Sequence, residues 1–96
     1  MSNRNAVALL SVLLPLLLTA PGARANMAAA NACAGALPRD ARAIYDATLP
    51  KLGPGANLRD QVTQTTRGLA ISGIIDRGNA RQSGTAAGEC LQRIAS

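Results

Sequence analysis

Apolar residues recur with a helical period between Asn57 and Ile75. At about 100° per residue, one face of this segment carries Leu58, Val62, Thr65 and Leu69. Asn57 is a favourable N-cap residue, and Asp60 lies in the first turn, where a carboxylate favours the positive end of a helix. The pattern therefore predicts a helix that begins directly after Asn57.

The period is lost in the second half of the same segment. Ile71, Ile74 and Ile75 point away from the face that the first half forms. The helix either ends at Gly73, a natural left-handed residue, or continues and is covered by neighbours on two sides. The isoleucines also fit a short strand over Leu69–Ile75. We expect a central helix flanked by two others.

Two further segments have helical spacing, and each carries its apolar residues on one face. The faces consist of Leu37, Ala41, Ile44, Tyr45 and Thr48 in the first segment, and of Ala80, Ser83, Gly84, Ala87, Leu91 and Ile94 in the second. Pro38 suits the first turn of the earlier helix. Gly84 and Gly88 are unfavourable inside a helix, so we expect them to permit close approach of another helix. The alanine-rich residues 26–35 form a further short helix or a frayed arm.

The first 25 residues have the three-part organisation of a secretory signal peptide. A polar start contains Arg4, an apolar run extends from Ala6 to Leu18, and Ala23-Arg24-Ala25 has the small–x–small form of a cleavage site. We expect cleavage after Ala25, with Ala30 as the second choice. The apolar run is shorter than the roughly 20 residues that a membrane-spanning helix needs. The predicted organisation is thus a signal peptide at 1–25 and a helical domain at 26–96, without stable membrane anchoring after cleavage.

The predicted domain is small and contains two cysteines, Cys33 and Cys90, near its opposite ends. It has no Phe or Trp, and chains of this size rarely bury enough apolar area to be stable without a covalent or metal constraint. In an exported protein, a structural disulfide is the default for two such cysteines. A redox pair is usually closer in sequence, and a zinc site needs two further ligands. We expect an all-α domain of three helices, or four with residues 26–35, closed by a Cys33–Cys90 disulfide.

The charge pattern argues against nucleic-acid binding. Ten basic residues less Arg4 and Arg24 leave eight against five acids, and these charges are interleaved. A nucleic-acid surface needs clustered basic residues, and the only aromatic residue, Tyr45, offers no stacking platform.

No residue pattern indicates catalysis or cofactor binding. The chain has no histidine, the commonest general base and metal ligand. It has no nucleophile elbow, phosphate-binding glycine loop or dinucleotide motif. The acidic residues lie within a turn of arginines, as expected for surface ion pairs. We therefore expect a protein that is not an enzyme and holds no cofactor or metal.

Three short segments carry a resemblance to a group of proteins. The sequences AIYDAT (43–48), LRDQVT (58–63) and AAGECL (86–91) resemble those of small exported bacterial proteins of uncharacterised function, which combine a signal peptide with one cysteine near each end of a helical domain. The resemblance implies a helical fold and an extracytoplasmic location, but no activity. A looser architectural similarity links the chain to periplasmic acid-stress chaperones, with no shared motif.

The sequence thus leads to the hypothesis of a periplasmic or secreted, non-enzymatic protein that binds a protein partner. Its only residue-level support is the group Ile71, Ile74 and Ile75, which would form an exposed apolar patch if the flanking helices leave it uncovered. A homodimer would bury the same patch. The alternative is a structural or stress-related periplasmic protein, similar to acid chaperones and without a specific ligand, in which these isoleucines are core.

Overall fold

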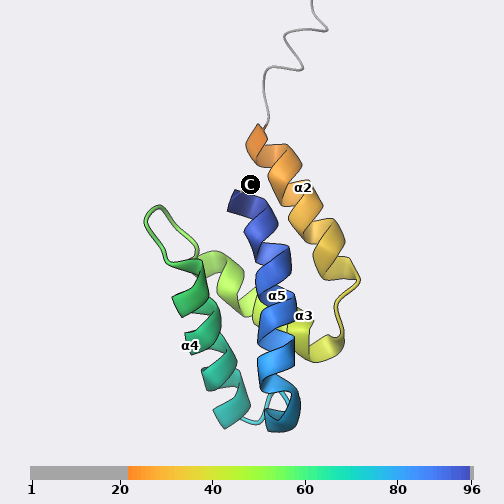
Figure 1. Ribbon diagram of the computed structural model, residues 1–96, viewed down its shortest axis with the longest axis vertical. Helices are drawn as coiled ribbons and strands as arrows, with labels where there is room; N and C mark the ends of the chain where they lie inside the picture. Colours follow the sequence, from red (N-terminus) through yellow and green to blue (C-terminus); the bar gives the residue numbers. More distant parts are fainter. Residues whose placement is uncertain (1–21, 96) are drawn as a thin grey trace, which may run out of the picture.

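The computed structural model describes residues 22–95, which form four α-helices and two short 3-10 helices (Figure 1). In chain order these are α2 (Gly22–Gly35), α3 (Arg39–Thr48), η1 (Leu49–Lys51), α4 (Leu58–Ile71), η2 (Arg77–Asn79) and α5 (Ala80–Ala95). The predicted all-α class is confirmed, with four helices in this part of the chain and not three. Residues 69–75 are not a strand. Of the predicted signal peptide, residues 1–21 lie outside the described residues, and 22–25 belong to α2.

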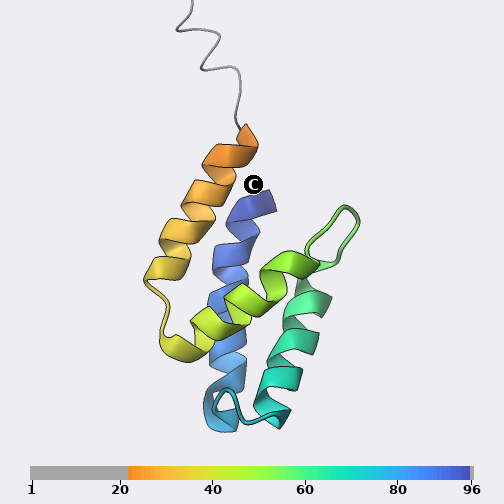
Figure 2. The same cartoon turned by 180° about the vertical axis from the view of Figure 1, so that it is seen from behind.

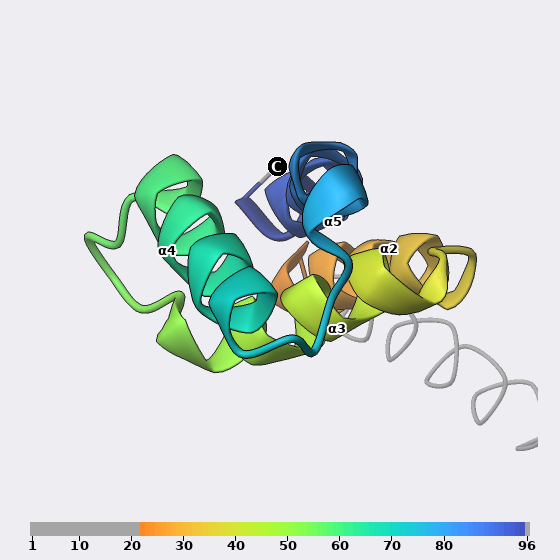
Figure 3. The same cartoon turned by 90° about the horizontal axis from the view of Figure 1, so that it is seen from below.

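The central helix is α5, and the prediction that the segment after Asn57 would be central is wrong. α5 packs against α2, α3 and α4, whereas α4 packs mainly against α5 and α3. In Figure 1, α2 and α4 lie on either side of α5, and the opposite view in Figure 2 shows α3 crossing in front of α5. The view from below in Figure 3 shows α4, α5 and α3 around a common interior. The side chains of Ala87, Cys90 and Leu91 on α5 are small or apolar, and all three are buried. Other helices can therefore pack against more than one side of α5.

Both ends of α4 follow from its local sequence. The Asn57 side chain caps the first turn by accepting a hydrogen bond from the Asp60 N–H at 3.1 Å. At the other end, Gly73 has φ +78°, and the Ile74 N–H donates to the Leu69 carbonyl at 2.9 Å. This is the Schellman arrangement, which needs a left-handed residue after the last helical turn. The interpretation that the helix ends at Gly73 is therefore confirmed.

The core is built from small residues and a few large ones. The largest fully buried side chains are Tyr45, Ile44, Leu91, Thr48 and Cys90, and they are accompanied by buried alanines of α2, α3 and α5. The Tyr45 hydroxyl donates to Asn31 Oδ1 at 2.9 Å, which links α3 to α2. Burial raises the pKa of Tyr45 above its ordinary value.

The predicted disulfide between Cys33 and Cys90 is confirmed. It joins α2 to α5 across a sequence separation of 57 residues, with the two Cα atoms 5.4 Å apart. Cys90 is buried and Cys33 is half-buried beside the same core. The bridge thus fastens the first described helix to the central one.

A carboxylate of α3 binds the backbone of the connection between α4 and α5. Asp40 Oδ2 accepts the Asp76 N–H at 2.9 Å, and Asp40 Oδ1 also pairs with Arg39 at 2.9 Å. The Asp76 side chain in turn accepts from the Gly78 N–H and from the Asn79 side-chain amide. Asp76 therefore caps this turn, and the Asn79 amide donates to it.

Candidate functional site

The three isoleucines that the sequence grouped together are separated in the structure. Ile71 and Ile74 are 67% and 56% exposed, but Ile75 is only 3% exposed and belongs to the core. The reversal of the chain at Gly73 causes this difference, because it turns Ile75 back toward the helices while Ile71 and Ile74 stay outside. A patch of all three residues does not form, and Ile75 is unsuitable as a binding residue.

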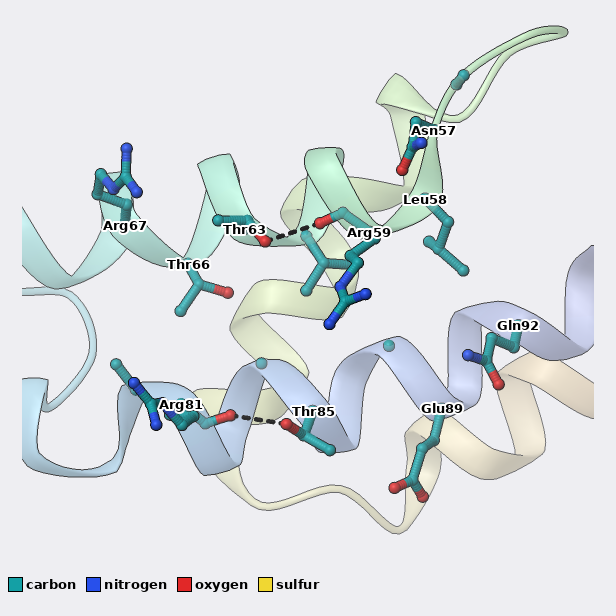
Figure 4. Close-up of a pocket in the computed structure, with 15 residues that line it drawn as sticks. Asn57, Leu58, Arg59, Thr63, Thr66, Arg67, Arg81, Thr85, Glu89 and Gln92 are labelled. Atoms are coloured by element: carbon teal, nitrogen blue, oxygen red, sulfur yellow. Dashed lines mark hydrogen bonds between the residues drawn. The ribbon is translucent and has the colours of Figure 1, made fainter.

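A groove between α4 and α5 has a volume of about 1180 Å³ (Figure 4). It lies on the side of these helices where they are not covered by α2 or α3 (Figure 1). The residues that matter most for its shape and charge are Arg59, Thr66, Arg67, Arg81, Gly84 and Gly88. The groove is open to the exterior, and its lining extends over residues 56–67 and 80–92, so it is suited to an elongated ligand.

Two glycines of α5 face this groove, and their surroundings differ. A Cβ added at Gly84 would lie 2.9 Å from Thr66 Oγ1, closer than real Cβ atoms approach. Gly84 therefore permits the close contact between α4 and α5 that the sequence predicted. A Cβ at Gly88 would meet nothing within 4 Å. The same prediction is wrong for Gly88, because α4 and α5 are farther apart there and the groove lies between them.

Thr66 lies where the two helices meet and has an unusual hydroxyl group. Its Oγ1 atom is buried and has no hydrogen-bond partner. Figure 4 shows the side chain pointing from α4 toward α5. An unpaired buried hydroxyl group lowers the stability of the folded state. At Thr66 this loss accompanies the close contact between α4 and α5 at Gly84.

The charge of the groove is positive. Arg59, Arg67 and Arg81 line it together with a single acid, Glu89. The ion pairs among residues 22–95 join Arg39 to Asp40 and Arg42 to Asp46, so they leave these three arginines unpaired. In Figure 4, Arg59 reaches from α4 toward α5, Arg67 points away from α5, and Glu89 points away from α4. Planar guanidinium groups bind carboxylates with two parallel hydrogen bonds, so the groove favours an anionic ligand.

The described residues offer little for other chemistry. Residues 22–95 contain no cluster of three His, Cys, Asp or Glu side chains that would hold a metal ion. What the groove presents is a concave surface between two helices that carries three arginines. Sequence reasoning missed it because Arg59 and Arg67 lie on the polar side of α4, where charged residues are ordinarily solvated; the two interior glycines of α5 were the available signal.

The chain matches no model of a known protein family, no curated protein and no solved structure in the three comparisons made. Within residues 22–95, the helices fall short of the length and apolar character that crossing a membrane requires.

Proposed function

We propose that this chain is an exported, non-enzymatic binding protein of the cell envelope, and that its α4–α5 groove holds an acidic helical segment of a partner protein. The observation that carries the proposal is an open groove with a side-chain-free position at Gly88 and three unpaired arginines along it.

The shape of the groove supports a helical occupant. Gly84 and Gly88 are one turn apart on α5; Gly84 is buried against Thr66, whereas Gly88 is partly exposed to the groove. Small residues at this spacing are the usual means by which two helices approach closely. Since contact with Thr66 already occupies Gly84, Gly88 is the position where the occupant would come nearest to α5.

The charge of the groove supports an acidic occupant. The arginines stand on both helices, with Arg59 and Arg67 on α4 and Arg81 on α5. A helix that lies between them and carries Asp or Glu along its flanks would meet guanidinium groups on either side. Because like charges oppose each other, the same arrangement disfavours basic partners.

Export is supported by the amino-terminal pattern and by the disulfide. Disulfides form and persist in oxidising compartments such as the periplasm or the exterior, and Cys33–Cys90 is formed here. The location is periplasmic or secreted on this proposal. The alternative is a structural or stress-related protein without a specific ligand. It assigns no function to the groove and predicts that no peptide binds there specifically.

A synthetic peptide provides the test. α4 has 14 residues, so the groove is on the order of 20 Å long and matches a helical peptide of about 15 residues. The probe is an amphipathic helical peptide of that length with glutamates along both flanks, and its control has glutamine at the same positions. We expect the acidic peptide to bind with a dissociation constant at least roughly tenfold lower, measured by fluorescence anisotropy.

The matched variants are Gly88→Leu and Gly68→Leu. Both glycines lie inside helices with nothing within 4 Å of an added Cβ, but only Gly88 lines the groove. Gly88→Leu should fill the groove and weaken binding of the acidic peptide about tenfold or more, while Gly68→Leu should leave it unchanged. Equal binding of the two peptides, or of the two variants, would overturn the proposal and favour the ligand-free alternative.

A further inference from the structure

The connection between α4 and α5 exposes two isoleucines at one end of the molecule. Ile71 ends α4 and Ile74 follows Gly73, and both are more than half exposed. Figures 1 and 2 place this connection at the end opposite the beginning of α2 and the carboxyl terminus. We define the tip as Ile71, Ile74, Arg67, Arg77 and Arg81.

Arginines stand beside the two isoleucines. Arg67 precedes Ile71 by one helical turn, so both lie on the same side of α4. The Arg77 Nε donates to the Ala70 carbonyl at 3.4 Å, which holds this side chain next to the turn that carries Ile71. Arg81 follows in the first turn of α5.

The acids near the tip are already engaged by neighbouring groups. Asp40 accepts the Asp76 N–H and pairs with Arg39. Asp76 accepts from the Gly78 N–H and from the Asn79 amide. Counting Arg39 with the three arginines of the tip gives four positive charges against two negative ones, so the net charge at this end is +2. Exposed apolar side chains beside three arginines that take part in neither of the ion pairs among residues 22–95 are therefore the dominant feature of this end.

We propose that the tip docks reversibly on an anionic lipid surface. Ile71 and Ile74 would enter the boundary between headgroups and acyl chains, and the arginines would lie among the lipid phosphates. Apolar area and attraction of basic residues to anionic lipid are the two contributions that give peripheral membrane binding. Such binding orients the chain with the tip toward the lipid, and it requires no membrane-spanning helix.

A second copy of the chain is a poorer occupant of this surface. In a symmetric pair the same patch lies on both subunits. The arginines of one tip would then face those of the other, and like charges destabilise such a contact. An anionic lipid surface would bury the isoleucines and pair its phosphates with the arginines at the same time.

Vesicle co-sedimentation tests the proposal with defined lipids. The probes are vesicles of phosphatidylcholine alone and vesicles with about 30% phosphatidylglycerol, which supplies the anionic surface. We expect binding to the anionic vesicles to exceed binding to the neutral ones at least roughly tenfold at low salt, and to fall as the salt concentration is raised and charges are screened.

The double variant Ile71→Ser/Ile74→Ser isolates the apolar contribution. Both side chains are exposed, so the variant should melt at the temperature of the parent protein, as followed by circular dichroism, yet bind anionic vesicles about tenfold or more weakly. The control is Gly88→Leu, which changes the groove and leaves the tip intact; its vesicle binding should equal that of the parent.

Two results would overturn the proposal. One is equal binding to neutral and anionic vesicles, or no binding to either. The other is a concentration-dependent dimer in sedimentation velocity that the isoleucine double variant abolishes, with no lipid binding, because the tip would then be an interface between copies. Since the groove variant and the tip variant are separate, failure of lipid binding leaves the peptide-binding proposal standing, and the reverse also holds.

Discussion

Gly84 and Gly88 show how the same residue type serves two purposes on one helix. Both lower the intrinsic helix propensity of α5 by about 1 kcal/mol relative to alanine. At Gly84 this loss is accompanied by close contact with Thr66, whereas at Gly88 no neighbour uses the space. The two positions therefore respond differently to an added methyl group.

The pair of substitutions Gly84→Ala and Gly88→Ala provides the first prediction. Gly88→Ala should raise the free energy of unfolding by up to about 1 kcal/mol, because it improves helix propensity without a clash. Gly84→Ala should lower it by about 1–3 kcal/mol, because Thr66 or the helices must shift. Urea unfolding of the three proteins measures both changes. Shifts of the same sign would contradict the assigned contact between Gly84 and Thr66.

At the scale of the helices, the α4–α5 connection depends on one carboxylate. The hydrogen bond from the Asp76 N–H, together with the hydrogen bond and charge of Arg39, holds the pKa of Asp40 below the ordinary value of an aspartate carboxyl group. A carboxyl group with a lowered pKa in the folded state stabilises the protein above its unfolded pKa. That stabilisation is lost as the pH falls through the lowered folded value.

The second prediction is a pH-dependent difference between the parent and Asp40→Asn. Well above pH 4 the parent should be the more stable protein by a constant amount, and the difference should shrink as the pH falls below the ordinary pKa of Asp. Thermal melting over this pH range measures it. Glu89→Gln is the control, since Glu89 is exposed on α5 and takes part in neither of the ion pairs among the described residues. A difference independent of pH would contradict the role of the charged form.

The position of α2 distinguishes the two expected cleavage sites. Ala30 is fully buried in the core with Ala34, and Asn31 accepts the hydrogen bond of Tyr45. Cleavage after Ala25 keeps all these residues in the mature chain. Cleavage after Ala30 removes Ala30 from the core and leaves only 31–35 to carry Cys33 on α2.

The third prediction is therefore a mature protein that begins at Asn26. The intact mass of protein recovered from the periplasm or the medium should correspond to residues 26–96. A mass that starts at Asn31 would show that the core tolerates the loss of Ala30, and a mass that includes Met1 would contradict export with cleavage.

For the molecule as a whole, the disulfide is the main constraint on a core of small side chains. Closing a loop of 57 residues corresponds to about 4 kcal/mol in the chain-entropy model. The buried set contains many alanines and few large residues, so the domain has little apolar area with which to compensate for a lost bridge.

The fourth prediction concerns the double variant Cys33→Ala/Cys90→Ala. Its free energy of unfolding should fall by about 2–4 kcal/mol, and its melting temperature should drop sharply in circular dichroism. Removing both sulfurs avoids a reactive free thiol, and the native parent should react with thiol reagents at neither position because both cysteines are bonded. Unchanged melting would show that α2 is held by packing alone.

Short-range features of the chain could be read from its residues. Three of these features depend on residues a few positions apart: the cap at Asn57, the end of α4 at Gly73, and the helical periods of α3 and α5. The disulfide follows from a simple count, because the chain has only two cysteines. Backbone propensities and caps act locally, so their outcome changes little with the rest of the fold.

Only the tertiary structure decided which faces are covered. A helical period states which residues share a face, but not which neighbour packs on it or how closely. This is why α5, not α4, is central, and why Ile75 is buried while Ile71 and Ile74 are exposed. It is also why Gly84 touches Thr66 whereas Gly88 opens into the groove: the separation of α4 and α5 changes along their length, and that separation is set by contacts between segments far apart in the chain.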